Sequence, residues 1–294
     1  MSARRADRAR DLRIIAGYAL RETVRRRVLV VVGILTLAFL ALYAYGSAQA
    51  FDEVSRFGAA PAGVDIQEEV LTGSTLLGLA MFVTLFLGTV LAVFVTLNAV
   101  RGDAERGLLQ PLVVRPVGRS TLLLARFLAA GALCVAYVCA VYAAAVALTG
   151  ATGGYWPDNL AFGAVALSAA VIVVVALALL GTTLLSSTAN GIAIFMIFGA
   201  GLAAGLIGQI GSALDSSSLE RISSIASWAL PFEALYQDGL HALTANVRGA
   251  TGVIVQLGPF GGAQDAGPLL YPYVLAYLVV VAVVANAIFR RADL

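Results

Sequence analysis

Six long apolar runs constrain the fold of this chain more than any other feature. They cover approximately residues 28–47, 74–98, 123–149, 161–185, 190–210 and 270–289. A helix needs about 20 apolar residues to cross the roughly 30 Å hydrocarbon core of a bilayer, and each run reaches that length. Past Arg126, at the start of the third run, no run contains Asp, Glu, Lys, Arg or His. We therefore predict an all-α integral membrane protein with six transmembrane helices.

The composition supports this fold class. Charged residues make up only 12% of the 294 residues and hydrophobic residues 60%, whereas soluble chains carry about 25% charged residues. We expect one transmembrane domain, residues 28–294, after a cytoplasmic segment, residues 1–27. Membrane lipid is thus an expected partner, and nucleic acid is not.

The arginines predict the orientation of the chain in the membrane. With the N-terminus in the cytoplasm, the inner segments are 1–27, 99–126, 186–190 and 290–294, with a net charge of +10. The outer segments then have a net charge of −8. Because cytoplasmic segments are enriched in arginine and lysine, we predict a multi-pass protein of the cell membrane with both termini in the cytoplasm.

The N-terminal segment has two alternative interpretations. Its apolar residues fall on one arc of a helical wheel, with arginines opposite: Leu12, Ile15, Ala16, Ala19, Leu20 and Thr23 against Arg10, Arg13, Arg21 and Arg25. This pattern favours an amphipathic helix in the membrane interface. The alternative is charge that only sets the topology. A cleaved signal peptide ending at Ala50 is disfavoured, because its apolar run and charged lead are too long.

Several residue types that enzymes need are missing or scarce. The chain contains no lysine, so it can hold neither a Walker A loop nor a Schiff-base amine. Its two cysteines, Cys134 and Cys139, and its one histidine, His241, are too few for the usual zinc or copper sites. We interpret the cysteines as small buried apolar residues. We do not expect this chain to be an enzyme or to bind a metal or cofactor.

The spans also lack the charged groups that ion-driven transporters usually place within the membrane. Energy for transport would therefore come from outside the hydrophobic region, which indicates a cytoplasmic motor. The segment between the second and third runs, residues 99–122, is the main candidate contact. A charged turn leads there into a short apolar stretch, Leu108 to Val114, which Pro116 and Gly118 interrupt. It could dock into a groove of a partner protein, or be an ordinary connecting loop.

This segment resembles the signature region of ABC type-2 transport permeases. Glu105 and Gly107 match an acidic, glycine-containing turn, and Leu108 begins the short helix. Pro116 and Arg119 match a Pro-x-x-Arg element. The six-span layout and the final residues 289–294 are also similar to that family, so the resemblance covers essentially the whole chain. The match is imperfect, since Ala125-Arg126 stands where Gly-Lys is common.

The resemblance implies a permease subunit, with export favoured, that forms a homodimer and works with two copies of a separate ABC ATPase subunit. ATP and Mg would be bound by that partner. The coupling contacts would be Arg101, Asp103, Glu105, Gly107, Leu108, Leu109, Pro116 and Arg119. The turn 186–190 would be a second, smaller contact. Two other function classes stay open: a membrane scaffold or assembly factor without a transport cycle, and a membrane-embedded enzyme, which the missing catalytic groups disfavour.

The fifth run and the outer loop carry two further patterns. Gly201 and Gly205 form a GxxxG motif, continued by Gly208, which predicts close helix packing. The packing could lie in a dimer interface or within one subunit. In the outer loop, residues 211–269, the spacing of apolar residues predicts two short helices separated by Pro231. The resemblance suggests that they dip into the outer leaflet. Glu233, Asp238 and His241 lie on the second helix; we expect them on a solvated face rather than in a metal or catalytic trio.

Overall fold

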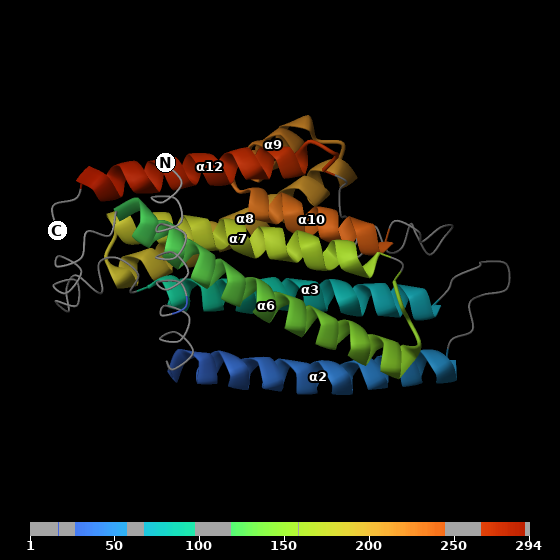
Figure 1. The fold of residues 1–294 in the computed structure, drawn as a ribbon. Coiled ribbons are helices and arrows are strands. Elements are labelled where there is room, and N and C mark those ends of the chain that lie inside the picture. Colours follow the sequence, from blue (N-terminus) through green and yellow to red (C-terminus); the bar gives the residue numbers. More distant parts are fainter. Residues whose placement is uncertain are drawn as a thin grey trace.

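The computed structural model describes residue 17 and residues 27–57, 68–97, 119–157, 159–244 and 266–291 (Figure 1). These residues form eight α-helices and no β-strand. The helices are α2 (Arg27–Phe57), α3 (Glu68–Thr96), α6 (Arg119–Gly153), α7 (Leu160–Leu184), α8 (Ser187–Ala213), α9 (Ser217–Ala229), α10 (Pro231–Thr244) and α12 (Leu270–Arg291). The predicted all-α fold is confirmed for this part of the chain.

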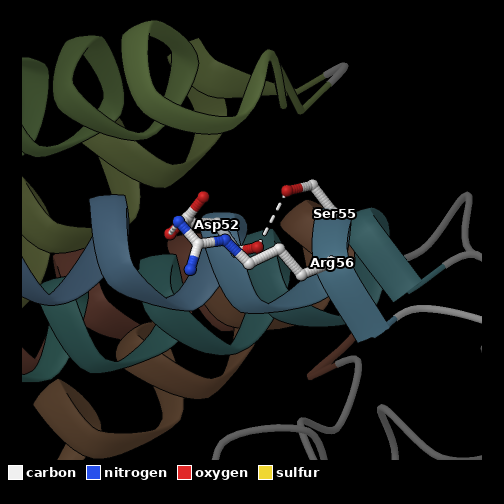
Figure 2. Close-up of polar contacts among 3 residues, drawn as sticks. All are labelled: Asp52, Ser55 and Arg56. Atoms are coloured by element: carbon white, nitrogen blue, oxygen red, sulfur yellow. Dashed lines mark hydrogen bonds and ion pairs between the residues drawn. The ribbon is translucent and has the colours of Figure 1, made fainter.

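Six of the helices, α2, α3, α6, α7, α8 and α12, are long and apolar enough to cross a membrane. This finding confirms the six predicted spans, although several helices extend beyond the apolar runs. Helix α2 continues ten residues past residue 47, to Phe57. On this last part, Arg56 pairs with Asp52 at 2.8 Å, and Ser55 Oγ donates a hydrogen bond to the Asp52 carbonyl (Figure 2). The side of the membrane on which each terminus lies stays a prediction.

Helix α7 occupies the centre of the bundle. It packs against α3, α6, α8, α10 and α12. Figure 1 shows it between the layer of α3 and α6 on one side and α8, α10 and α12 on the other. Its buried residues occur all around the helix, among them Leu167, Val171 and Val174. A helix that is hydrophobic on every side can be covered either by lipid or by other helices. Here α7, the most apolar span, is covered by five neighbouring helices.

Helix α2 lies at one edge of the bundle, against α3 and α6 (Figure 1). Two side-chain hydrogen bonds join it to α6. The hydroxyl groups of Tyr43 and Thr149 are 2.6 Å apart, and those of Thr36 and Tyr137 are 2.5 Å apart. Since apolar packing between helices gains little over lipid, polar contacts of this kind help to define where α2 sits.

The turn between α7 and α8 is shorter than predicted. The non-helical residues are Leu185 and Ser186 alone, so most of the predicted turn 186–190 forms the first turn of α8. Asn190 Nδ2 donates a hydrogen bond to the Ala178 carbonyl at 3.0 Å. The Asn190 side chain also lies against Gly181, where a Cβ atom would come within 1.9 Å of Asn190 Oδ1. The amide side chain thus fits between the two helices, and α8 can begin immediately.

Candidate functional site

The predicted outer loop, residues 211–269, contains the two short helices that the sequence predicts, α9 and α10. Helix α9 folds back along α8. A Cβ atom on Gly211 would lie 2.9 Å from Leu219, and one on Gly208 would lie 2.3 Å from Ser223 Oγ. Later residues of α9 therefore contact earlier residues of α8, so the two helices run antiparallel. Figure 1 shows both short helices toward one end of the bundle.

The junction between α9 and α10 lies beside the middle of α8. Gly205 faces the Glu233 carboxylate and Gly201 faces the Phe232 ring; added Cβ atoms would meet them at 2.0 and 2.5 Å. At a rise of 1.5 Å per residue, Gly205 lies about 9 Å below Gly211, where the candidate span ends. The pair α9–α10 is therefore a hairpin that enters the bundle and returns, and we call it the re-entrant hairpin.

The glycine row of α8 supports this hairpin. Gly201, Gly205 and Gly208 all face side chains of α9 or α10 in the same chain. Without side chains at these positions, the hairpin backbone can approach α8 closely. Of the two interpretations of the GxxxG motif, the observed contacts are those of packing within one subunit. A dimer interface on these glycines stays a prediction.

Helix α10 is anchored in the core. Phe232 is fully buried and stacks on Phe198 of α8 with ring centroids 5.6 Å apart. Leu235 and Leu240 are also almost completely buried, and a Cβ atom on Gly239 would come within 2.7 Å of Ala166 on α7. Because α10 packs this closely on the central helix, the polar residues that it carries have defined positions.

Glu233 and Asp238 are buried, so the expected solvated face is wrong for both. Glu233 is 2% exposed and Asp238 is 6% exposed. Gln237 Nε2 donates a hydrogen bond to Glu233 Oε1 at 2.9 Å. Tyr271 Oη of α12 donates one to Asp238 Oδ2 at 3.1 Å. The carboxylates are buried because α10 packs against other helices around most of its circumference.

Burial raises the pKa of Glu233 from 4.5 to about 7, and hydrogen bonds from Gln237 and Ser227 oppose this shift. Desolvation dominates because it disfavours the charged form more than two neutral hydrogen-bonding groups favour it. The carboxyl group of Glu233 therefore changes its charge near neutral pH.

The position of Glu233 adds a carboxyl group beside the spans, although the six apolar runs themselves contain none. The re-entrant hairpin brings Glu233 to the level of the middle of α8. One signal was present in the sequence. Glu233 is seven residues from the buried Leu240, and positions seven apart lie on nearly the same side of a helix. The sequence does not show how deep the hairpin lies, so this spacing alone does not predict a buried carboxyl group.

A cavity of about 430 Å³ opens between α8, α9, α10 and α12. Glu233 and Gln237 of α10 and Glu220 of α9 contribute polar groups to its wall. Trp228 and Tyr273 also line it, with their rings edge-to-face and their centroids 4.5 Å apart. The Tyr273 hydroxyl donates a hydrogen bond to the Trp228 carbonyl, which joins α12 to the end of α9. The cavity combines carboxylates, hydrogen-bonding groups and aromatic rings.

The other predicted site residues lie elsewhere. Arg101, Asp103, Glu105, Gly107, Leu108, Leu109 and Pro116 are outside the described residues, as is most of the N-terminal segment. Arg119 is the first residue of α6. Cys134 is buried and Cys139 half-buried, and both are free thiols. Within the described ranges, no three His, Cys, Asp or Glu side chains are grouped so that they could hold a metal ion.

Comparison with known families gives one result. The model of the family described as "ABC-2 family transporter protein" matches residues 13–294. The match thus extends over all six spans, the segment between α3 and α6, and the re-entrant hairpin. No curated protein gives a significant match to the chain.

Proposed function

This chain belongs to the ABC-2 transporter family, and we propose that it forms the substrate pathway of an exporter. Permeases of this family are multi-pass membrane subunits without an ATPase domain, and they act with ABC ATPase subunits. The observation that carries the proposal is the extent of the match, from residue 13 to residue 294. Export is proposed because the family mostly exports.

The proposed transport cycle begins at the segment 99–122. Closure of two ATPase subunits on ATP and Mg would push on this segment, at Arg101, Asp103, Glu105, Gly107, Leu108, Leu109, Pro116 and Arg119. Because the segment joins α3 to α6, and these two helices pack on each other and on α7, a push on it would move the centre of the bundle. The spans would then alternate between inward-open and outward-open states.

The proposed orientation places the termini and the segment 99–122 in the cytoplasm and the re-entrant hairpin at the outer side. The charge distribution supports it, with +10 on the inner and −8 on the outer segments. We further propose that two copies of the chain form the pathway, since six spans enclose only a narrow passage. The hairpin, packed on α8 of its own chain, would lie at the outer exit of each copy.

The charge-reversal variants Glu105→Arg and Arg119→Glu test this proposal. The tagged chain would be expressed with the ATPase encoded beside it, purified, and placed in liposomes. We expect both variants to lose ATPase co-purification or ATP hydrolysis. Glu53→Arg is the matched control, because Glu53 is exposed near the opposite end of the span layer. Unaltered assembly and hydrolysis in both variants would contradict the coupling role. A wild-type chain that never associates with an ATPase would favour a scaffold.

A further inference from the structure

The cavity beside the re-entrant hairpin is acidic and is lined in part by aromatic side chains. Glu233, 2% exposed, lies against Gly205. Glu220 and Trp228, near opposite ends of α9, are exposed, and Trp228 is 52% exposed. The residues that line the cavity include no arginine and no histidine. A molecule in the cavity therefore meets two carboxyl groups and no fixed positive charge from the lining.

The buried carboxylate has no cationic partner in the described part of the chain. Gln237 and Ser227 contact it as neutral donors, and no ion pair to Glu233 is formed there. Burying a carboxylate without a counter-ion is costly, and an ionisable group beside membrane spans is typical of a functional site. A bound cation would offset this cost.

The aromatic rings favour a particular kind of cation. Trp228 and Tyr273 line the cavity together, and aromatic side chains offer a large contact area to the apolar portion of a ligand. Leu270 and Ala234 add apolar surface to the wall. The volume of about 430 Å³ lies within the range of small-molecule pockets and leaves room for more than a bare metal ion.

Other polar groups also lie in the wall. Gln237 donates through Nε2 to Glu233, and its Oε1 atom is buried and accepts no hydrogen bond within the described structure. Ser223 and Ser227 line the same cavity and add hydroxyl groups to it.

We propose that this cavity binds an organic cation in which an ammonium group is joined to an apolar portion, with the ammonium group beside Glu233 and the apolar portion against Trp228 and Tyr273. The role of such a compound as a ligand of the outer part of the pathway rests on the proposed function. The binding itself requires neither ATPase nor transport, so it can be measured separately.

The charges around Glu233 define the expected pH dependence. Helix α9 contributes Glu220, α10 contributes Tyr236, α12 contributes Tyr273, and α8 contributes only Gly205, Gly208 and Gln209. The pKa of Glu233 is raised to about 7. A permanently charged ligand should therefore bind more tightly as the pH rises from 6 to 8, because Glu233 gains its negative charge.

The test measures binding of benzyltrimethylammonium to the purified full chain in a neutral maltoside detergent by titration calorimetry. N,N-dimethylbenzamide, a neutral compound of similar size, is the ligand control. We expect at least tenfold tighter binding of the cation at pH 8, and at least a tenfold loss of that binding in Glu233→Gln. Glu53→Gln, an exposed acid on α2, should bind as the wild type does. Glu220→Gln should weaken binding less than Glu233→Gln, because Glu220 is solvated.

Equal binding of both ligands by the wild type would overturn the proposal. So would unchanged cation binding by a Glu233→Gln variant that elutes and melts as a folded protein. Trp228→Leu is a second variant that leaves both carboxyl groups of the cavity unchanged. Its affinity for the cation should also fall. Cation binding without ATPase association would contradict the proposed function alone, whereas ATPase association without cation preference would contradict this inference alone.

The same ammonium chemistry occurs in soluble amines and in lipid head groups. Competition with short-chain phosphatidylethanolamine, compared with phosphatidylglycerol of equal chain length, separates these sources. Displacement of the probe by phosphatidylethanolamine alone would support an ammonium site that takes a lipid head group. If neither lipid displaces the probe, the result would support an ammonium site that takes a soluble amine.

Discussion

The carboxylate of Glu233 lies so close to Gly205 that a Cβ atom at position 205 would sit 2.0 Å from Glu233 Oε1. This contact joins the first turn of α10 to the middle of α8, and Gln237 holds the carboxylate in place through a hydrogen bond of 2.9 Å. Two features follow from this one relationship. The absence of a side chain at residue 205 leaves room for the Glu233 carboxylate at this depth, and an acidic group is placed beside a span that itself contains none.

Gly205→Ala should destabilise the hairpin. The added methyl group would displace the buried Glu233 side chain, and overpacking of this kind costs about 1–3 kcal/mol. We expect a lower melting temperature for the purified protein in detergent. Gly199→Ala on the same helix is the matched control, because a Cβ atom there meets nothing within 4 Å. Equal melting temperatures for the two variants would contradict the observed packing.

Glu233 should make stability depend on pH. Its pKa is 4.5 when exposed and about 7 in the folded protein, so the folded state holds the proton more tightly. The contribution is fully present below pH 4.5 and is lost as the pH rises through 7, by roughly 3 kcal/mol at most. In the absence of ligand, the melting temperature should fall between pH 5 and pH 8.

Glu233→Gln should reduce this pH dependence, because the amide is neutral throughout the range. At pH 8 the variant should melt at a higher temperature than the wild type, and the two should converge near pH 5. Parallel melting curves for both proteins across this range would show that Glu233 does not titrate as its burial implies.

The hydrogen bond between Tyr43 and Thr149 should contribute to the attachment of α2. The oxygens are 2.6 Å apart and both side chains are buried, so Tyr43→Phe leaves Thr149 with one partner fewer. A loss of about 0.5–1.5 kcal/mol is expected, seen as a lower melting temperature. Tyr45→Phe is the control, since Tyr45 is 67% exposed on the same helix. A shift of the same size in the control would assign the effect to something other than this bond.

Tyr271→Phe should loosen the contact between α10 and α12. The Tyr271 hydroxyl donates to Asp238 Oδ2 at 3.1 Å, and Asp238 is 6% exposed. Removing a donor from a buried acid costs about 1–3 kcal/mol. Proteolysis or hydrogen exchange of α10 should therefore increase in the variant. Exchange rates identical to those of the wild type would indicate that water replaces the hydroxyl at no cost.

The sequence predicts some parts of this fold well and others poorly, for physical reasons. The six spans follow from run length, because a bilayer imposes about 20 apolar residues on each crossing helix. The two outer helices follow from Pro231 and the spacing of apolar residues around it. In each case the signal is local.

The depth of the hairpin is a tertiary property that no local pattern specifies. Gly205 and Glu233 are 28 residues apart in the chain, and neither indicates alone that they touch. For the same reason, Glu233 and Asp238 are expected on a solvated face but are buried. The proposed coupling residues other than Arg119 lie outside the described residues, so their roles stay predictions.

The most direct test of the central proposal is ATP hydrolysis by the complex that co-purifies with this chain, measured in liposomes. The account predicts that a separate ABC ATPase subunit co-purifies with the wild-type chain and with Glu53→Arg, and that the complexes hydrolyse ATP. It predicts loss of association or hydrolysis for Glu105→Arg and Arg119→Glu. A wild-type chain that purifies without an ATPase and shows no hydrolysis would contradict it.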